Sequence, residues 1–190
     1  MPKKVDHRER RTRIADALVR VAAEQGLEAV SLRHVAAEAG VSAGMVQHYF
    51  RTKDEMMAFA MAVVRERGQA RVAAAVAGLG EDPPPRLLLR TLIGALLPLD
   101  EGTRDDGRVA LAFLAHLAVR PAAAPGLREE TAQLTEFIAG LLPSRDAAAA
   151  AGLLALMEGL GVYLLGGQYT GEQALGALDA HLDLLFDRAA

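Results

Sequence analysis

The sequence predicts an all-α protein of nine helices in two parts. Apolar residues recur at intervals of three and four along most of the chain, whereas no stretch alternates with the period of two that marks a half-buried strand. Glycine and proline clusters divide these stretches into segments of helical length, and no internal repeat is present. At 190 residues, the chain is long enough to bury a sizeable core and to form one or two domains.

The first predicted helix spans residues 8–25 and follows a short basic arm, residues 1–7. Its apolar residues are spaced by 3, 1, 3 and 1, which places them on one face; they are Ile14, Ala17, Leu18, Val21 and Ala22. Gly26 ends the helix. Four arginines occupy the start of the helix, where the dipole disfavours a cation. This placement favours either an external anion, such as the DNA backbone, or a solvated charged face.

Residues 31–53 predict two short helices joined by a tight turn, followed by the start of another helix. Ser31 takes the N-cap position of the first short helix. Gly40 stands at the end of this helix, where a residue in the left-handed conformation commonly ends a helix. Ser42 caps the second short helix. A helix, a four-residue turn and a helix form the geometry that lays the second helix in a DNA major groove.

The fourth predicted helix begins at Thr52, with Glu55 as its capping-box partner, and continues to about residue 77. Glycine and proline loops separate the remaining helices, which span about residues 86–97, 105–120, 127–142, 145–167 and 171–188. Gly102 marks the loop before the sixth helix, Ser144 caps the eighth, and Thr170 begins a second capping box at the ninth.

A run of motif positions at fixed spacing joins the first helix to the start of the fourth. They are Ile14, Ala17, Gly26, Leu27, Ser31, Val35, Ala36, Ala39, Gly40, Val41, Ser42, Gly44, His48, Tyr49, Phe50 and Lys53. Through these residues, roughly the first 65 positions resemble the DNA-binding domain of the TetR family of transcriptional regulators. The resemblance implies a TetR-like architecture with a DNA-binding domain over residues 8–65 and an effector-binding and dimerisation domain over residues 66–190.

The second short helix would be the recognition helix of such a domain. Val46 and Phe50 lie four residues apart and should face inward. The Gln47 amide has the geometry to bind adenine, and Met45 or Ala43 can touch a thymine methyl group. The family usually has threonine in place of Met45 and tyrosine in place of Gln47, so the operator sequence stays open.

His48 and Tyr49, at the end of the recognition helix, resemble family positions that contact phosphate or bases. Lys53, at the start of the next helix, resembles a lysine of the family that contacts phosphate. The residues predicted to meet DNA are Ser31, Arg33, Ser42, Ala43, Gly44, Met45, Gln47, His48, Tyr49 and Lys53. The alternative is a helix-turn-helix that is reused for contact with protein.

Charge is distributed unevenly along the chain. The formal net charge is −3, but residues 1–53 carry ten Lys and Arg against six Asp and Glu, a net of +4. The remaining residues carry eleven against eighteen, a net of −7. A basic first part beside an acidic second part favours contact between the first part and DNA phosphate.

The eighth predicted helix carries three glycines one heptad apart, at positions 152, 159 and 166. A glycine inside a helix costs about 1 kcal/mol relative to alanine, so this stripe indicates close approach of another helix. The resemblance implies that the last two helices form a dimer interface, which would place two recognition helices about 34 Å apart. The predicted interface residues are Gly152, Leu156, Gly159, Tyr163, Leu175, Leu178, Leu182 and Leu185. The alternative places both helices in the core of a monomer.

The resemblance also implies a cavity for a small effector among the fourth to eighth helices. The candidate lining residues are Met61, Phe113, His116, Phe137, Met157, Glu158 and Tyr163. For His116 the alternative is an ordinary core or surface histidine, and for Glu158 it is a pair across the dimer or exposure to solvent. The second part of the chain also resembles, more loosely, the C-terminal domains of BetI-type members, and this does not identify the effector.

Several classes of protein are excluded or disfavoured. The sequence has no cysteine, so a disulfide framework and thiolate chemistry are excluded. It has no phosphate-binding glycine loop, no HExxH and no nucleophile elbow, and its five histidines are scattered, so we expect no enzyme, no cofactor and no metal site. The charged start of the chain lacks a signal peptide, and the apolar stretch over residues 147–167 is expected to be a buried helix, so we expect a cytoplasmic protein.

The combined observations predict a homodimeric, sequence-specific transcriptional regulator that binds double-stranded DNA at a palindromic operator. Repression and release by a small-molecule effector are implied by the resemblance alone. Two alternatives stay open, namely a dimeric DNA-binding protein that responds to no effector and a protein-interaction module that retains a helix-turn-helix.

Overall fold

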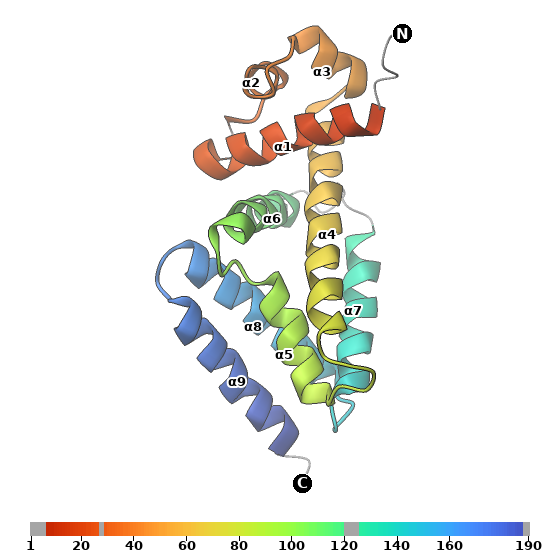
Figure 1. The fold of residues 1–190 in the computed structure, drawn as a ribbon, viewed down its shortest axis with the longest axis vertical. Coiled ribbons are helices and arrows are strands. Elements are labelled where there is room, and N and C mark those ends of the chain that lie inside the picture. The colour runs from red at the N-terminus through yellow and green to blue at the C-terminus, as the bar shows by residue number, and fades with distance from the viewer. Residues whose placement is uncertain (1–6, 27–28, 120–125, 188–190) are drawn as a thin grey trace. The chain divides into compact units, whose positions relative to one another are not determined.

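The computed structural model describes residues 7–26, 29–119 and 126–187, and that part of the chain contains nine helices and no strand (Figure 1). The prediction of an all-α fold is therefore confirmed, while the basic arm lies largely outside the described residues. The helices are α1 His7–Gln25, α2 Leu32–Glu38, α3 Ala43–Tyr49, α4 Lys53–Ala77, α5 Pro85–Leu96, α6 Glu101–Val119, α7 Leu127–Leu141, α8 Ala147–Leu165 and α9 Gly171–Asp187.

The chain divides into two compact units. The first unit, here called the head, comprises the residues up to Arg67 together with residues 105–116 of α6. The second unit, here called the body, comprises residues 68–104 and those from Leu117 onward. Helices α4 and α6 therefore contribute residues to both units. The functional boundary predicted between residues 65 and 66 stays a prediction.

The head is built on the apolar face of α1. The predicted stripe of α1 is buried, and α2 packs on α1 while α3 packs on α2. Val46 and Phe50 are fully buried, as the spacing of the recognition helix predicts. From α6, Val109 is buried in the same core and Phe113 packs against it. The core therefore fixes α3 with one face inward and leaves its other face in solvent.

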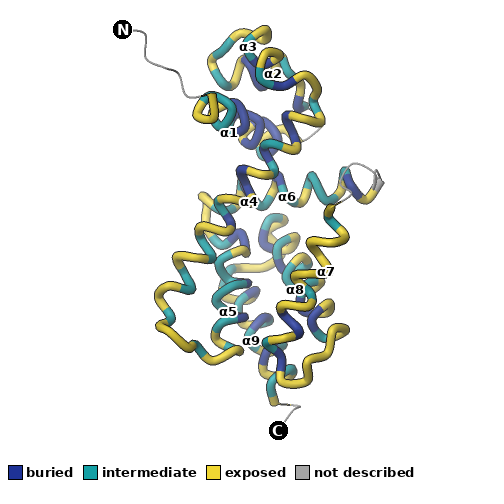
Figure 2. Tube along the Cα trace, turned by 90° about the vertical axis from the view of Figure 1, so that its right-hand side faces the viewer, coloured by how far each residue is buried: buried dark blue, intermediate teal, exposed yellow. Residues whose placement is uncertain are grey.

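The body is a bundle of α5, α7, α8 and α9. Its core includes Leu89, Leu153, Leu160, Leu178 and Leu182. Helix α8 is long and apolar enough to cross a membrane by length and composition alone, but one face of it forms part of this core. Figure 2 marks the buried positions along the bundle in dark blue. The sequence predicts a buried helix, but only 22% of this apolar stretch is buried in the single chain.

The start of α6 differs from the sequence prediction. The sequence predicts a loop at Gly102, but α6 begins at Glu101 and includes this glycine in its first turn. The Asp100 carboxylate accepts a hydrogen bond from the Thr103 backbone N–H at 2.9 Å, and the Thr103 hydroxyl accepts one from the Asp100 N–H at 3.1 Å. This reciprocal cap satisfies the first turn and offsets the low helix propensity of glycine.

The cap of α8 also differs from the prediction. Asp146, and not Ser144, is the N-cap, and its carboxylate accepts a hydrogen bond from the Ala148 backbone N–H at 2.8 Å. Arg145 adopts a positive φ of 53° immediately before it, so the chain reverses there instead of continuing as a helix. At α9 the predicted capping box is confirmed, because Thr170 and Gln173 exchange side-chain-to-backbone hydrogen bonds of 2.9 and 3.2 Å.

Candidate DNA-binding site and dimerisation surface

The turn between α2 and α3 is held by two serine caps and a glycine. The Ser31 hydroxyl accepts a hydrogen bond from the His34 backbone N–H at 3.1 Å, and the Ser42 hydroxyl accepts one from the Met45 N–H at 3.1 Å. Gly40 has a φ of +65°, the left-handed conformation predicted for it. Each serine hydroxyl still carries a proton that it can donate outward. The helix-turn-helix predicted from these residues is confirmed as local structure.

Helix α3 presents one face to solvent. The predicted DNA-contacting residues that are exposed are Ser31, Arg33, Ser42, Ala43, Gly44, Gln47 and His48. Met45, Tyr49 and Lys53 are half-buried. Their roles in DNA contact stay predictions, but each lies at the surface of the head where a groove or a phosphate can reach it.

Arg11 anchors the inner face of the recognition helix. Its guanidinium lies 5.0 Å from the ring centre of Phe50 and 4.5 Å from that of Phe59. It also pairs with Glu55 at 3.9 Å. These contacts join α1 to the end of α3 and to α4. Cation–π contacts of this kind contribute about 0.5–2 kcal/mol each, so Arg11 positions α3 and is not itself free to meet DNA.

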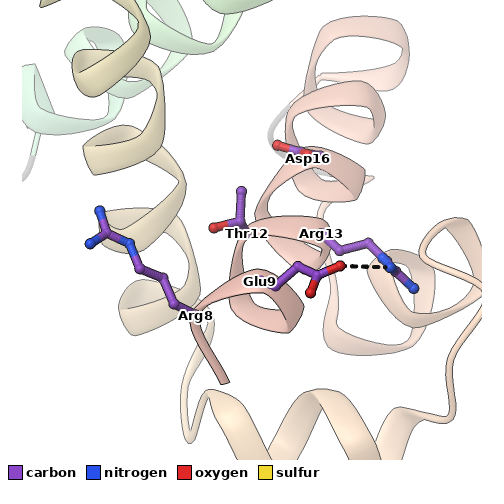
Figure 3. Close-up of a pocket in the computed structure, with 5 residues that line it drawn as sticks. All are labelled: Arg8, Glu9, Thr12, Arg13 and Asp16. Carbon is purple, nitrogen blue, oxygen red and sulfur yellow. Dashed lines mark hydrogen bonds and ion pairs between the residues drawn. The ribbon is translucent and has the colours of Figure 1, made fainter. Parts of the chain in front are cut away.

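The other cations of α1 also have partners within the head. Arg8 pairs with Glu66 at 3.1 Å, and Arg13 pairs with Glu9 at 3.5 Å. A hollow of about 420 Å³ on this face of α1 is lined by Arg8, Glu9, Thr12, Arg13 and Asp16. Figure 3 shows these side chains and the Glu9–Arg13 pair. Three of the four arginines at the start of α1 therefore have a carboxylate partner within the head, and a contact of this face with an external anion stays a prediction.

Two residues outside the predicted set touch the recognition helix. The Arg10 guanidinium lies 3.7 Å from the sulfur of Met45. The ring of His7 lies 5.6 Å from that of Tyr49, measured between centroids. Periodicity could not find either contact, because it depends on the angle at which α1 crosses α3. The spacing of the apolar residues in α1 shows only that neither His7 nor Arg10 belongs to the buried stripe.

The capping box predicted at α4 forms in part. The Thr52 hydroxyl accepts a hydrogen bond from the Glu55 backbone N–H at 3.0 Å. The Glu55 carboxylate, however, accepts from the backbone N–H of Arg51 at 2.9 Å, one residue before the expected partner. The junction between α3 and α4 is thus closed by two hydrogen bonds, and it sets the position of Lys53.

The body exposes an apolar surface along α8. A Cβ atom added at Gly152 or Gly159 would meet nothing within 4 Å, so two of the three glycines border open space in the single chain, whereas one added at Gly166 would meet the Gln168 side chain. Tyr163 is 46% exposed and packs edge-to-face on Tyr169, with ring centroids 4.9 Å apart. Leu156 is half-buried on the same stripe. This surface has the small residues that allow a second helix to approach closely.

The α9 leucines predicted for the dimer interface are buried in the core of the single chain or pack against it, and their role in dimerisation stays a prediction. Leu178 and Leu182 are fully buried in the core of the body, and Leu175 and Leu185 pack against that core. Leu184, which lies outside the predicted set, is 53% exposed. The 3, 4, 3 spacing of the leucines therefore identified the inner face of α9, because spacing shows that a face is covered but not which chain covers it.

The candidate effector residues are divided between the two units. Met61, Phe113 and His116 belong to the head, where Met61 and Phe113 already pack against its core. Phe137, Met157, Glu158 and Tyr163 belong to the body. Phe137 is 51% exposed on α7 and Met157 packs against the body core. The role of all seven in binding an effector stays a prediction.

Glu158 is the acidic residue of α8. Partial burial raises the pKa of its carboxyl group, because desolvation penalises the charged form. The residue keeps much of its surface exposed beside the apolar stripe. A carboxylate in this position is sensitive to any partner that covers the surface of α8.

Comparison with known proteins agrees with this geometry. Residues 14–59 match the family described as "Bacterial regulatory proteins, tetR family", and residues 85–187 match "BetI-type transcriptional repressor, C-terminal". The HTH-type transcriptional regulator BetI of Burkholderia thailandensis is 31% identical over 192 residues, with 97% of both chains covered. The HTH-type transcriptional regulator PksA of Bacillus subtilis is 39% identical over 116 residues, which are 61% of this chain and 55% of that one.

Solved structures are similar to this chain as well. A transcriptional regulator from Rhodococcus sp. Rha1 has a TM-score of 0.81 and 36% identity, over 92% of this chain and 95% of that one. The multidrug binding protein EbrR, solved in complex with imidazole, has a TM-score of 0.60 and 31% identity, over 90% of this chain and 94% of that one.

The helical fold of the described residues and the matched families together define a transcriptional regulator with an N-terminal DNA-binding domain, and homologues of this class are not enzymes. The chain belongs to the TetR family, and its C-terminal part is of the BetI type.

Proposed function

We propose that the protein is a homodimeric repressor that binds a palindromic operator and releases it when a small-molecule effector binds the body. The observation that carries the DNA-binding part is the orientation of α3, whose Val46 and Phe50 are fully buried while Gln47 and His48 are exposed. A helix fixed on one face and solvated on the other is suited to enter a major groove without rearrangement.

Sequence readout is assigned to the middle of α3. Gln47 can bind adenine through two hydrogen bonds, and the Met45 side chain offers an apolar surface to a thymine methyl group. The contact of Arg10 with the Met45 sulfur restricts that side chain. Ser31, Ser42, Tyr49 and Lys53 are assigned to the DNA backbone, which positions the head but does not specify sequence.

Dimerisation is assigned to the apolar surface of α8 and α9. Val162 on α8 and Leu184 on α9 are 40% and 53% exposed, and a Cβ atom added at Gly152 or Gly159 would meet nothing within 4 Å in its own chain. Exposed apolar surface of this kind is costly in a monomer and is covered when a second copy packs on it. A two-fold axis here would supply the second recognition helix that a palindrome requires.

Effector binding is assigned to the body on two grounds. Residues 85–187 match a BetI-type repressor C-terminal domain, and EbrR is described as a multidrug binding protein. Repression is proposed because the matched C-terminal family is one of transcriptional repressors, and release by an effector is proposed because it is the usual response of the TetR family. The protein would act in the cytoplasm, because a bacterial regulator must reach DNA there.

Selection of genomic fragments by the purified protein tests this function. Fragments would be bound at moderate salt, washed and sequenced, with a Gln47→Ala and Tyr49→Ala double variant as a control. A shared motif with two inverted half-sites supports the proposal. Retention without a shared motif supports a basic surface with no readout, and absence of retention supports a protein-interaction module. Release of the recovered fragments by small organic cations or aromatic compounds would separate an effector-responsive repressor from an effector-independent one.

A further inference from the structure

Three aromatic rings lie next to one another where the start of α1 meets the end of α3. The centroids of His7 and Tyr49 are 5.6 Å apart with ring planes at 63°, and those of His48 and Tyr49 are 5.2 Å apart at 80°. Both histidines are exposed and Tyr49 is half-buried between them. His48 and Tyr49 belong to the motif that carries the family resemblance, whereas His7 lies outside it.

The ring contacts hold the two imidazoles in place. Edge-to-face packing of aromatic rings contributes about 0.5–1.5 kcal/mol beyond the burial of area. An exposed side chain that is already restricted loses less rotamer entropy when it binds a ligand. His7 and His48 are therefore presented to solvent in a limited range of orientations on either side of the Tyr49 ring.

The carboxylates near this cluster are engaged by arginines. His7 lines a groove of about 360 Å³ between α1 and α4 that also includes Arg8, Arg11 and Glu66. Glu66 pairs with Arg8 at 3.1 Å, and Glu55 pairs with Arg11 at 3.9 Å.

On the side of α2, the carboxylate of Glu38 accepts a hydrogen bond from Arg20 at 2.6 Å. Within the described residues, neither His7 nor His48 has a carboxylate within ion-pair distance. A proton taken up by either ring therefore adds a positive charge that is available to an external anion.

We propose that His7 is a further phosphate-contacting residue of the DNA-binding surface, and that His7 and His48 together make DNA binding tighten as pH falls. This inference rests on the proposed function, because it requires DNA to lie against α3. Histidine is the side chain type that ordinarily changes charge between about pH 5 and 8. A nearby phosphate favours the charged form, so binding takes up protons.

The size of the effect follows from counterion release. Each cation that neutralises a DNA phosphate steepens the plot of log K against log salt by about 0.9. Two imidazolium groups would therefore steepen the slope by up to about 1.8 per head between pH 7.5 and 5.5. The contribution of His7 is half of that change.

Fluorescence anisotropy of the full-length protein on a labelled 30-bp duplex of arbitrary sequence provides the test. Binding would be measured over a range of KCl concentrations at pH 5.5, 6.5 and 7.5. The variants are His7→Gln, His48→Gln and the double variant, with His181→Gln on α9 as the matched control. Circular dichroism would verify that each variant is folded, and an arbitrary duplex is suitable because phosphate contact does not require the operator.

The wild type and His181→Gln should show a steeper salt slope at pH 5.5 than at 7.5. His7→Gln should lose about half of that difference, and the double variant should lose all of it. A difference that is unchanged in His7→Gln would overturn the assignment of His7 while leaving DNA binding intact. Binding that still tightens at low pH in the double variant would place the proton uptake elsewhere and overturn the proposal. Absence of binding under every condition would overturn both this inference and the DNA-binding function.

Discussion

The guanidinium of Arg67 on α4 lies 3.1 Å from the carboxylate of Asp106 on α6. Among the described residues Asp106 is the one buried charged side chain, with 4% of its surface exposed. Arg67 also pairs with Asp16 on α1, so one guanidinium joins three helices of the head. Desolvation acts to lower the pKa of Arg67, but the hydrogen bonds and charges of Asp106 and Asp16 outweigh it and raise that pKa. Arg67 therefore stays charged throughout the ordinary pH range.

Replacement of Asp106 should destabilise the head more than replacement of Asp16. Asp106→Asn removes the charge that compensates a partly buried guanidinium, and we expect the free energy of unfolding to fall by about 1.5–3 kcal/mol. Asp16 is more exposed, so Asp16→Asn should cost less than about 1 kcal/mol. Urea denaturation of the two variants measures the difference. Equal losses would contradict the argument from burial.

Gln47→Ala should relax base preference at one position of each operator half-site. The exposed amide is suited to two hydrogen bonds with adenine, and its loss should cost about 1–3 kcal/mol at that base and little elsewhere. Sequencing of DNA selected from a random library by each protein measures this change. Gln133→Ala on α7 is the matched control and should leave the profile unaltered. A wild-type profile in Gln47→Ala would exclude the readout role.

Lys53→Ala should weaken binding to every sequence by a similar factor. A lysine that binds phosphate contributes to affinity through counterion release and not through base readout. The slope of log K against log salt should therefore become shallower by about 1 for each phosphate that the variant no longer neutralises. Anisotropy at fixed pH on specific and arbitrary duplexes measures both effects. If the slope is the same as in the wild type, Lys53 does not bind phosphate.

Gly159→Leu should separate the dimer without unfolding the chain. A Cβ atom at this position would meet nothing within 4 Å in its own subunit, and leucine is a better helix former than glycine, so the monomer should be at least as stable. In a dimer, however, the side chain would occupy the space of the approaching helix. Gly140→Leu on α7 is a matched control, because that position is also open. Sedimentation velocity should report a monomer for the first variant and a dimer for the second.

Glu158→Gln should stabilise the protein at neutral pH. A raised folded-state pKa means that the folded protein holds the Glu158 proton more tightly than the unfolded chain does. The contribution of the protonated carboxyl to stability is complete below the pKa of the unfolded chain and is lost as pH rises through the pKa of the folded protein. At pH 7 the charged Glu158 carboxylate therefore lowers the free energy of unfolding. The gain from glutamine should shrink as pH falls toward 4.5. Urea unfolding at pH 7.0 and 4.5, with Glu136→Gln as control, tests the sign; a gain that grows at low pH would contradict it.

Helix positions could be predicted from the sequence, but some of their ends could not. Apolar spacing and glycine placed all nine helices of the described residues, and the capping box at Thr170 formed as expected. The start of α6 was missed because a glycine was given more weight than the reciprocal cap between Asp100 and Thr103. The start of α8 was missed because Ser144 and Asp146 are both good caps, and only the positive φ of Arg145 decides between them.

The candidate site could also be predicted only in part from the sequence, because some of its contacts depend on tertiary structure. The outward face of α3 could be predicted because Val46 and Phe50 fix its inward face. The contacts that His7 and Arg10 make with α3 could not, because they depend on how two helices cross. On α9 the leucine spacing identified the covered face, so the exposed Leu184 was overlooked.

Hydroxyl-radical footprinting of the protein on a fragment recovered by selection tests the central claim most directly. A dimer with two exposed recognition helices predicts two protected half-sites related by a two-fold axis, with centres about one helical turn apart, or about 34 Å. Gly159→Leu should weaken both protections together. A single protected half-site at saturating protein, or protection spread evenly along the fragment, would contradict the account of a dimeric, sequence-specific regulator.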